Sequence, residues 1–371
     1  MTSLAVAPRA GQLECICEPG TLGDGTIDRR GMAFLAAGFA FSVLAQVLTL
    51  GILPLAGLSL APTRGLATLP YAAFYVGAAL ASLPAALLLD SFGRRAAFAL
   101  GGSLGAAGGL ILAWALVSMH FGTLVLGAFW LGIAGGFSLF YRHAAVPVGG
   151  RGAGALLLVF GAATLASLTA PTVALMAETL ASPQVFVGTA AAAALAHVAS
   201  LAMTASLPYR RLREPGVAGS SLKEWRSALL PTGIGTLGWF AMTALMGATP
   251  IAVIGCAPSE AAFGAVAWHV MAMYAPSLAL AVIPQAARPI PLSATGILLL
   301  IVGAACFALS GTAGAFAASA VLAGAGWSLV MLGTTLWIHR NGQASRWILG
   351  LHDAALLGGA ILGALAAGSL A

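Results

Sequence analysis

The sequence contains very few charged residues. Only 7% of its 371 residues are Asp, Glu, Lys or Arg, whereas 60% are hydrophobic and the mean hydropathy is +1.00. A soluble domain carries roughly a quarter charged residues. This scarcity of charge excludes an ordinary soluble domain and predicts an all-α, polytopic membrane protein whose main partner is the lipid bilayer. The net charge of +6 does not require nucleic acid, and none is predicted.

Other features are absent too. Four cysteines are too few for a disulfide framework. The first thirty residues lack the cationic start, apolar run and cleavage site of a signal peptide. There is no phosphate-binding loop, no nucleotide-binding glycine pattern, and no hydrolytic or redox constellation. We therefore predict no enzyme, no permanently bound cofactor and no ATP-driven transport on this chain.

The chain instead contains eleven apolar runs long enough to span a bilayer as helices. They lie at about 32–54, 66–89, 96–119, 121–141, 152–176, 184–208, 231–255, 260–283, 291–311, 313–338 and 346–370. This pattern predicts a tail (1–30), a six-helix bundle (31–208), a basic linker (209–230) and a second bundle (231–371).

The positions of Lys and Arg support this count. If the N-terminus is cytoplasmic, fifteen of the sixteen basic residues fall on the cytoplasmic side, and only Arg64 falls on the other. Such a split is what the positive-inside rule predicts. We expect a bacterial inner-membrane protein with a cytoplasmic N-terminus and a periplasmic C-terminus.

The segment between the second and third spans reads Asp90-Ser-Phe-Gly93-Arg94-Arg95. Gly93 permits a tight turn, and Asp90 can pair with the arginines or with a neighbouring helix N-terminus. The segment resembles the signature loop Gly-x-x-x-Asp-x-x-Gly-Arg-Lys/Arg of the major facilitator superfamily, with Ala86 in place of the first glycine. The resemblance implies two helical halves around a cavity, normally twelve helices, and a gating role for this loop.

Two later spans carry soft metal donors. Met242-x-x-x-Met246 lies in the seventh and His269-x-x-x-Met273 in the eighth. A spacing of four places both side chains of a pair on one helix face. Counted from the helix ends at 1.5 Å per residue, Met246 and His269 are both roughly 13 Å deep, and Met242 and Met273 share the next level. Thioether and imidazole without a carboxylate favour copper, especially Cu(I).

Together with Cys256, these pairs resemble the copper importers of the superfamily that supply the cbb3-type cytochrome c oxidase. The resemblance implies import of copper by alternating access for haem–copper oxidase assembly. Copper is then the substrate, and a cytoplasmic copper chaperone is a candidate partner.

The four cysteines leave alternatives open. Cys256 and Cys306, near the outer side, are either small buried hydrophobes, an entry relay for Cu(I), or a disulfide in an oxidising compartment. Cys15 and Cys17 in the tail are either an incidental pair of reduced cysteines or two thiols that bind one Cu(I) ion.

A carboxylate lies well inside the last span, in His352-Asp353. Intramembrane ionisable residues mark function by default, so this pair is either a proton relay for coupling or a cross-helix hydrogen bond. His197 is interpreted as a structural hydrogen-bond partner. His120, His143 and His339 fall at membrane edges, where they carry little information.

The resulting interpretation is a major-facilitator-type copper importer. One rival is a proton-coupled carrier of a small organic molecule, in which the Met pairs are packing and Asp353 is central. The other is a non-transporting facilitator-like assembly factor that docks onto a respiratory or photosynthetic complex.

Overall fold

The structure is a computed structural model that describes residues 29–145, 152–207, 222–309, 311–340 and 344–370. Within these residues the secondary structure is helical throughout. The helices are α1 (Arg29–Leu60), α2 (Leu69–Val117), α3 (Phe121–Ala145), α4 (Gly152–Gly161), α5 (Ala163–Ala181), α6 (Val187–Ala205), α7 (Leu222–Ile254), α8 (Ser259–Val282), α9 (Pro289–Leu309), α10 (Ala313–Ile338) and α11 (Arg346–Leu370), with short 3-10 turns at Arg64–Leu66 and Pro284–Ala286.

Helix α2 is too long for a single crossing. Its 49 residues would extend roughly 74 Å at 1.5 Å per residue, against a hydrocarbon core of about 30 Å. The backbone leaves helical geometry at Gly93, where φ is 82°, a value that glycine adopts without a Cβ clash. Phe74 and Gly108, on either side of this break, both pack against α3 at the level of Leu131 and Gly132. Helix α2 therefore turns back on itself.

This turn accounts for the number of crossings. Ten helical segments among the described residues are long and apolar enough to cross a membrane, and one of them, 154–181, joins α4 and α5. Because α2 crosses twice, the described part of the chain makes eleven crossings, as the apolar runs predict. The odd number places Arg29 and Leu370 at opposite ends of the bundle.

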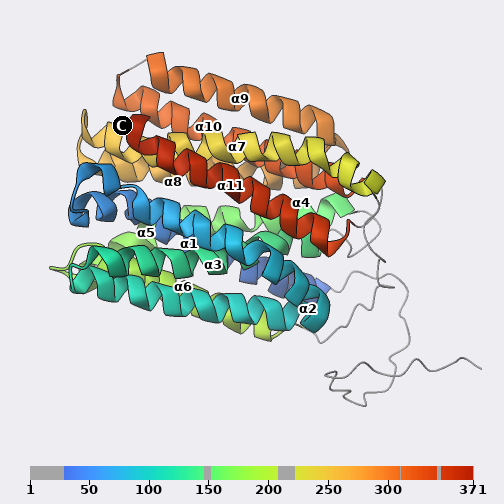
Figure 1. Ribbon diagram of the computed structural model, residues 1–371, viewed down its shortest axis with the longest axis horizontal. Helices are drawn as coiled ribbons and strands as arrows, with labels where there is room; N and C mark the ends of the chain where they lie inside the picture. Colours follow the sequence, from blue (N-terminus) through green and yellow to red (C-terminus); the bar gives the residue numbers. More distant parts are fainter. Residues whose placement is uncertain (1–28, 146–151, 208–221, 310, 341–343, 371) are drawn as a thin grey trace, which may run out of the picture.

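The helices form two halves that face each other (Figure 1). In the first half, α2 packs along α3 and α6, and α1 packs along α5 and α6. In the second half, α10 packs against α7, α8 and α9, and α7 packs along α11. The halves meet where α11 lies against α2 and where α8 lies against α4 and α5. A central space between two such halves is where a carrier holds its substrate.

The two ends of the bundle differ in charge. We call the basic end the one where α1 and α11 begin and α2 turns at Gly93, because it carries most of the described arginines. Helix α7 also begins there, at Leu222, so Lys223 and Arg226, expected in the linker, lie in its first turns. Linker residues before 222, and the tail with Cys15 and Cys17, lie outside the described residues. That the basic end faces the cytoplasm stays a prediction.

Candidate functional site

A cavity lies between the two halves. It encloses about 940 Å³ of space free of atoms, a figure that includes the open space at its mouth. Both halves contribute to its wall. The lining comes from α1, α2, α3 and α4 on one side and from α7, α8, α10 and α11 on the other. A ligand held here would contact both halves at once.

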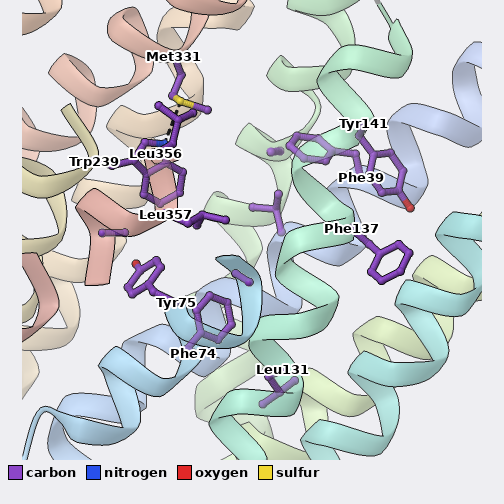
Figure 2. Packing of buried hydrophobic residues seen from close by; sticks show 14 of the residues in the cluster. Phe39, Phe74, Tyr75, Leu131, Phe137, Tyr141, Trp239, Met331, Leu356 and Leu357 are labelled. Atoms are coloured by element: carbon purple, nitrogen blue, oxygen red, sulfur yellow. Dashed lines mark hydrogen bonds between the residues drawn. The ribbon is translucent and has the colours of Figure 1, made fainter. Parts of the chain in front are cut away.

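Eight aromatic rings line this cavity. Six of them, each from a different helix, form what we call the aromatic layer. They are Phe39 (α1), Tyr75 (α2), Phe160 (α4), Trp239 (α7), Tyr274 (α8) and Trp327 (α10). Neighbouring rings lie close together, with centroids 5.1 Å apart for Trp239 and Trp327, 5.1 Å for Phe160 and Tyr274, and 6.0 Å for Tyr75 and Trp239. Figure 2 shows Phe39, Tyr75 and Trp239 among the packed side chains. Aromatic faces of this kind stack against flat ring systems.

The predicted soft donors lie in the same cavity. Met242, Met246, His269 and Met273 all line it, with His269 and Met242 each only 2% exposed. They lie further from the basic end than Trp239 and Tyr274 of the same two helices. Helices α7 and α8 therefore turn these faces toward one space, a point that the sequence alone leaves open. Metal ligation by them stays a prediction, and no group of three or more His, Cys, Asp or Glu in the described chain could hold a metal ion.

Polar groups in the cavity are few and mostly neutral. Gln46 donates to Ser138 Oγ at 2.8 Å, joining α1 to α3. The His269 Nδ1 lies 2.7 Å from the carbonyl oxygen of Ala320, so Nδ1 carries the proton and Nε2 is left as an acceptor. The Trp327 Nε1–H is buried and has no acceptor among the described residues. These groups could bind the edge of a heterocycle, whereas the aromatic layer could bind its faces.

The cavity ends toward the basic end at a buried ion pair. Arg142 of α3 contacts Asp353 of α11, and the two side chains are 2% and 0% exposed. Arg142 also lines the cavity, and its Nη1 lies 3.6 Å from the Met331 sulfur. The Trp239 Nε1–H donates to the same sulfur at 3.2 Å. One residue, Arg142, therefore belongs both to the cavity wall and to a contact between the two halves.

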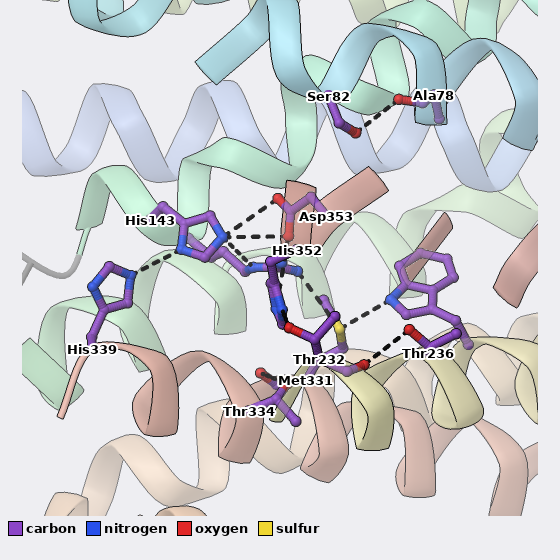
Figure 3. Close-up of polar contacts among 12 residues, drawn as sticks. Ala78, Ser82, His143, Thr232, Thr236, Met331, Thr334, His339, His352 and Asp353 are labelled. Carbon is purple, nitrogen blue, oxygen red and sulfur yellow. Dashed lines mark hydrogen bonds and ion pairs between the residues drawn. The ribbon is translucent and has the colours of Figure 1, made fainter. Parts of the chain in front are cut away.

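Three histidines surround this pair (Figure 3). His143 Nδ1 lies 3.0 Å from His339 Nε2, which joins α3 to the end of α10. His143 Nε2 lies 3.4 Å from Asp353 Oδ2. His352 Nδ1 lies 2.8 Å from Thr232 Oγ1 of α7. We call Arg142, His143, His339, His352 and Asp353 the buried polar cluster, which ties the two halves together at the basic end.

Sequence reasoning found only part of this cluster. Asp353 and His352 were predicted as candidates for coupling, and both are buried. Arg142 is one of the fifteen basic residues that the sequence predicts on the cytoplasmic side, and the structure shows it buried in the cavity wall. His143 and His339 were set aside as membrane-edge residues, and they contact each other here. The signal that could have found Arg142 was Asp353 itself, because a buried carboxylate requires a cationic partner.

The predicted gating loop makes a weaker contact at the same end. Arg346 Nε of α11 lies 3.8 Å from Asp90 Oδ1, and the Asp90 side chain is 69% exposed. This solvated pair between the loop and the second half contributes little stability. Gly93 forms the turn as expected, and Arg94 and Arg95 follow it. Their gating role stays a prediction.

The remaining cysteines lie away from the cavity. Cys256 is exposed, Cys306 is half-buried, and both thiols are free, so the disulfide alternative is not formed. Neither lines the cavity between the described helices. Their role as an entry relay for copper stays a prediction. Neither cysteine shares the cavity with the four soft donors.

Comparison with known proteins defines the class. No family model matches the chain. The curated riboflavin transporter RfnT of Brucella anthropi is 29% identical over 363 residues, which cover 94% of this chain and 90% of that protein. The human organic anion transporter MFSD10 has a TM-score of 0.65 at 15% identity, covering 91% of this chain and 92% of its own. The E. coli fucose:proton symporter FucP has a TM-score of 0.60 at 16% identity, covering 91% and 95%.

The chain therefore has the major facilitator fold, in agreement with the prediction from the Asp90–Arg95 loop. The relatives are transporters, which agrees with the prediction that the chain is not an enzyme. None of these proteins is named for copper or for cytochrome oxidase. The finer resemblance to copper importers of the cbb3-type oxidase thus receives no support from them.

Proposed function

We propose that this protein carries a flat, aromatic small molecule across the membrane by alternating access, with riboflavin as the first candidate. The observation that carries the proposal is the aromatic layer, which lines a cavity between the two halves of a major facilitator fold. The likeness to a riboflavin transporter along nearly the whole chain supports the choice of substrate.

The chemistry of the cavity suits such a molecule. Riboflavin has a planar three-ring system with carbonyl and ring-nitrogen groups on its edge and an uncharged polar tail. The rings of the aromatic layer can stack on its faces. Gln46, Ser138 and the Trp327 Nε1–H supply neutral hydrogen-bonding groups for its edge and tail, and Arg142 supplies one charged donor. Because Arg142 is already paired with Asp353, the lining presents no unpaired charge and favours a neutral ligand.

Alternating access follows from how the cavity is closed. The buried polar cluster holds α3 against α11 at the basic end. Separating these helices would open the cavity there, while the opposite ends of the halves approach each other. If the basic end faces the cytoplasm, as the positive-inside rule predicts, this step releases substrate into the cell and the protein is an importer.

The test is riboflavin uptake by cells that cannot synthesise it. Expression of the wild-type chain should restore growth at low external riboflavin. Trp239→Ala should raise the riboflavin concentration that gives half-maximal uptake by about five- to 150-fold, because one stacking partner is lost, at ~1–3 kcal/mol per stacked ring. The matched control is Trp268→Ala, since Trp268 of α8 is 65% exposed on the outer surface. Equal uptake by both variants would contradict the proposal.

Copper import is the second candidate. The observation that favours it is that Met242, Met246, His269 and Met273 line one cavity. Copper uptake should fall to background in Met242→Ala and in His269→Ala if these residues hold the metal. Wild-type copper uptake in both variants, combined with riboflavin uptake by the wild-type chain, would assign the methionines to packing.

A further inference from the structure

We propose that the part of the cavity beyond the aromatic layer, away from the basic end, binds the hydroxylated tail of the substrate, with His269 Nε2 as the hydrogen-bond acceptor. The inference rests on the proposed function, because it concerns how the same cavity recognises its substrate. It narrows the substrate class to flat ring systems that carry an uncharged chain of hydroxyl groups.

The first observation is where His269 lies along the cavity. His269 of α8 is 2% exposed and lines the cavity, and its Nδ1 lies 2.7 Å from the carbonyl oxygen of Ala320 on α10. Ala320 precedes Trp327 on α10 by about two helical turns, roughly 10 Å. Helix α10 ends at the basic end, where His339 joins the buried polar cluster. His269 therefore lies on the side of the aromatic layer that is remote from Arg142.

The second observation is that the His269 ring is held in one orientation. Helix α10 approaches α8 so closely that a Cβ at Gly324 would clash with the His269 carbonyl oxygen. Gly324 and Ala320 are one turn apart on the same face of α10, so α10 holds both the backbone and the ring of His269. Because a carbonyl oxygen only accepts, Nδ1 carries the proton and Nε2 presents a lone pair. No partner for Nε2 lies among the described residues, so this acceptor is available to a ligand in the cavity.

The third observation is the set of groups around His269. The methionines of the two soft-donor pairs present thioether sulfurs, which are weak acceptors. The Tyr71 ring lies against α7 beside Met246, because a Cβ at Gly247 would be 3.0 Å from that ring. The Tyr75 hydroxyl donates to the Tyr71 hydroxyl at 3.4 Å, and Tyr71 keeps its own proton to donate elsewhere. Among the described lining residues, this level of the cavity thus offers acceptors and a hydroxyl but no charged group.

A chain of hydroxyl groups fits this level better than the edge of a flavin ring does. Each hydroxyl both donates and accepts, so it can donate to His269 Nε2 and accept from Tyr71. The carbonyl oxygens of a flavin only accept, and they would face the Nε2 lone pair with no proton between them. Donors for these oxygens lie elsewhere, in the Trp327 Nε1–H and in Arg142. The ring system therefore lies in the aromatic layer with its accepting edge toward the basic end, and the tail extends toward His269.

The experiment compares two flavins that share one chromophore and differ only in the tail. Riboflavin carries the hydroxylated chain, whereas lumiflavin carries a methyl group in its place. Quenching of flavin fluorescence by the full-length protein in detergent gives the Kd of each. In His269→Phe a ring remains but the acceptor is lost, so a tail hydroxyl is left buried without a partner. The Kd for riboflavin should rise at least about fivefold, while the Kd for lumiflavin stays within about twofold of wild type.

Two further variants test the assignment to Nε2. His269→Gln returns an acceptor oxygen near the position of Nε2, and it should bind riboflavin more tightly than His269→Phe does. His120→Phe is the matched control, because His120 is exposed directly before α3 and does not line the cavity. Its Kd for riboflavin should equal that of the wild type.

The outcomes separate this inference from the proposed function. An unchanged riboflavin Kd in His269→Phe, or equal losses for riboflavin and lumiflavin, would overturn the inference while the proposed function stands. Wild-type protein that binds neither flavin would overturn the proposed function and this inference with it.

A measurement on the wild type covers the case in which His269→Phe does not fold. Tail hydroxyls that form hydrogen bonds in the cavity should make riboflavin bind at least about twofold more tightly than lumiflavin, by the net value of one hydrogen bond. Lumiflavin that binds as tightly as riboflavin would show that the tail makes no net contact, and it would overturn the inference.

Discussion

The cavity and the buried polar cluster meet at Arg142 but differ in what holds them together. The cavity wall is apolar and aromatic, and each ring of the aromatic layer has several neighbours, as Trp327 does in Phe160, Trp239 and Tyr274. The cluster instead depends on single partners, above all Arg142 and Asp353. A wall of many weak contacts tolerates change, whereas a buried charge depends on its one counterion.

This difference predicts which substitutions change substrate affinity alone and which also change the stability of the fold. Substitutions in the aromatic layer should change substrate affinity while leaving the bundle folded, because neighbouring rings keep the wall packed. Substitutions in the cluster should affect folding and the opening of the basic end together. The following changes test this contrast, from the largest expected effect to the smallest.

The largest effect is expected for Asp353→Ala. It leaves Arg142 buried without its counterion, and removing one partner of a buried pair costs about 3–5 kcal/mol. The thermal unfolding midpoint of the purified protein in detergent should fall accordingly. By comparison, Met246→Leu in the cavity wall conserves volume and should cost less than about 1.5 kcal/mol. A similar loss in both variants would remove the contrast between the two regions.

The double variant Arg142→Met with Asp353→Leu sharpens this test. Replacing both charges by apolar side chains leaves no unpaired ion, and such replacements are often neutral or stabilising. Most of the stability lost in Asp353→Ala should return, because no buried charge is left without a partner. A double variant as unstable as the single one would show that the cluster stabilises the fold by more than charge pairing.

The sequence predicts the fold well but only half of the site. Apolar run length and the distribution of arginine gave eleven crossings, and Gly93 was recognised as the turn that divides α2. The spacing of four predicts that each soft-donor pair, that of Met242 and that of His269, lies on one face of its helix. These are local properties, and local properties can be read from one segment at a time.

Arg142 and the aromatic layer were missed for the opposite reason. Arg142 lies 211 positions from Asp353, and nothing in its own segment distinguishes a buried cation from a topology charge at a helix end. The six rings come from six helices, so no local pattern links them. Soft donors close together on two neighbouring helices gave a stronger local signal than rings dispersed over the chain, and this favoured the copper interpretation.

An intermediate loss of stability is expected from a change at Gly93. This residue forms the turn of α2 at the basic end, where the backbone conformation, rather than a charge, determines the structure. A Cβ at this position would meet open space, but φ is +82°, so Gly93→Ala should cost about 1–2 kcal/mol for the left-handed geometry alone. Gly233→Ala is the matched control, since its Cβ also meets open space but Gly233 lies within α7. That change should stabilise the protein by up to about 1 kcal/mol. Equal unfolding midpoints for the two variants would show that the turn at Gly93 can adopt another backbone conformation without loss of stability.

The smallest effect is expected from removing one N–H group in the aromatic layer. Trp327→Phe keeps a ring but deletes a buried donor that has no acceptor among the described residues, so the unfolding midpoint should stay the same or rise slightly. Riboflavin binding should weaken about two- to tenfold if this donor serves the substrate, because a net hydrogen bond contributes ~0.5–1.5 kcal/mol.

Trp239→Phe is the control for that change, because the Trp239 Nε1–H is already bonded to the Met331 sulfur at 3.2 Å. Its ring would still face the cavity, so riboflavin affinity should remain within about twofold of the wild type, given the modest net value of one hydrogen bond. Flavin fluorescence titration of both purified variants gives the comparison directly. If Trp239→Phe weakens binding and Trp327→Phe does not, the substrate contacts the wall on the α7 side, next to Arg142, rather than at the unpartnered donor of α10.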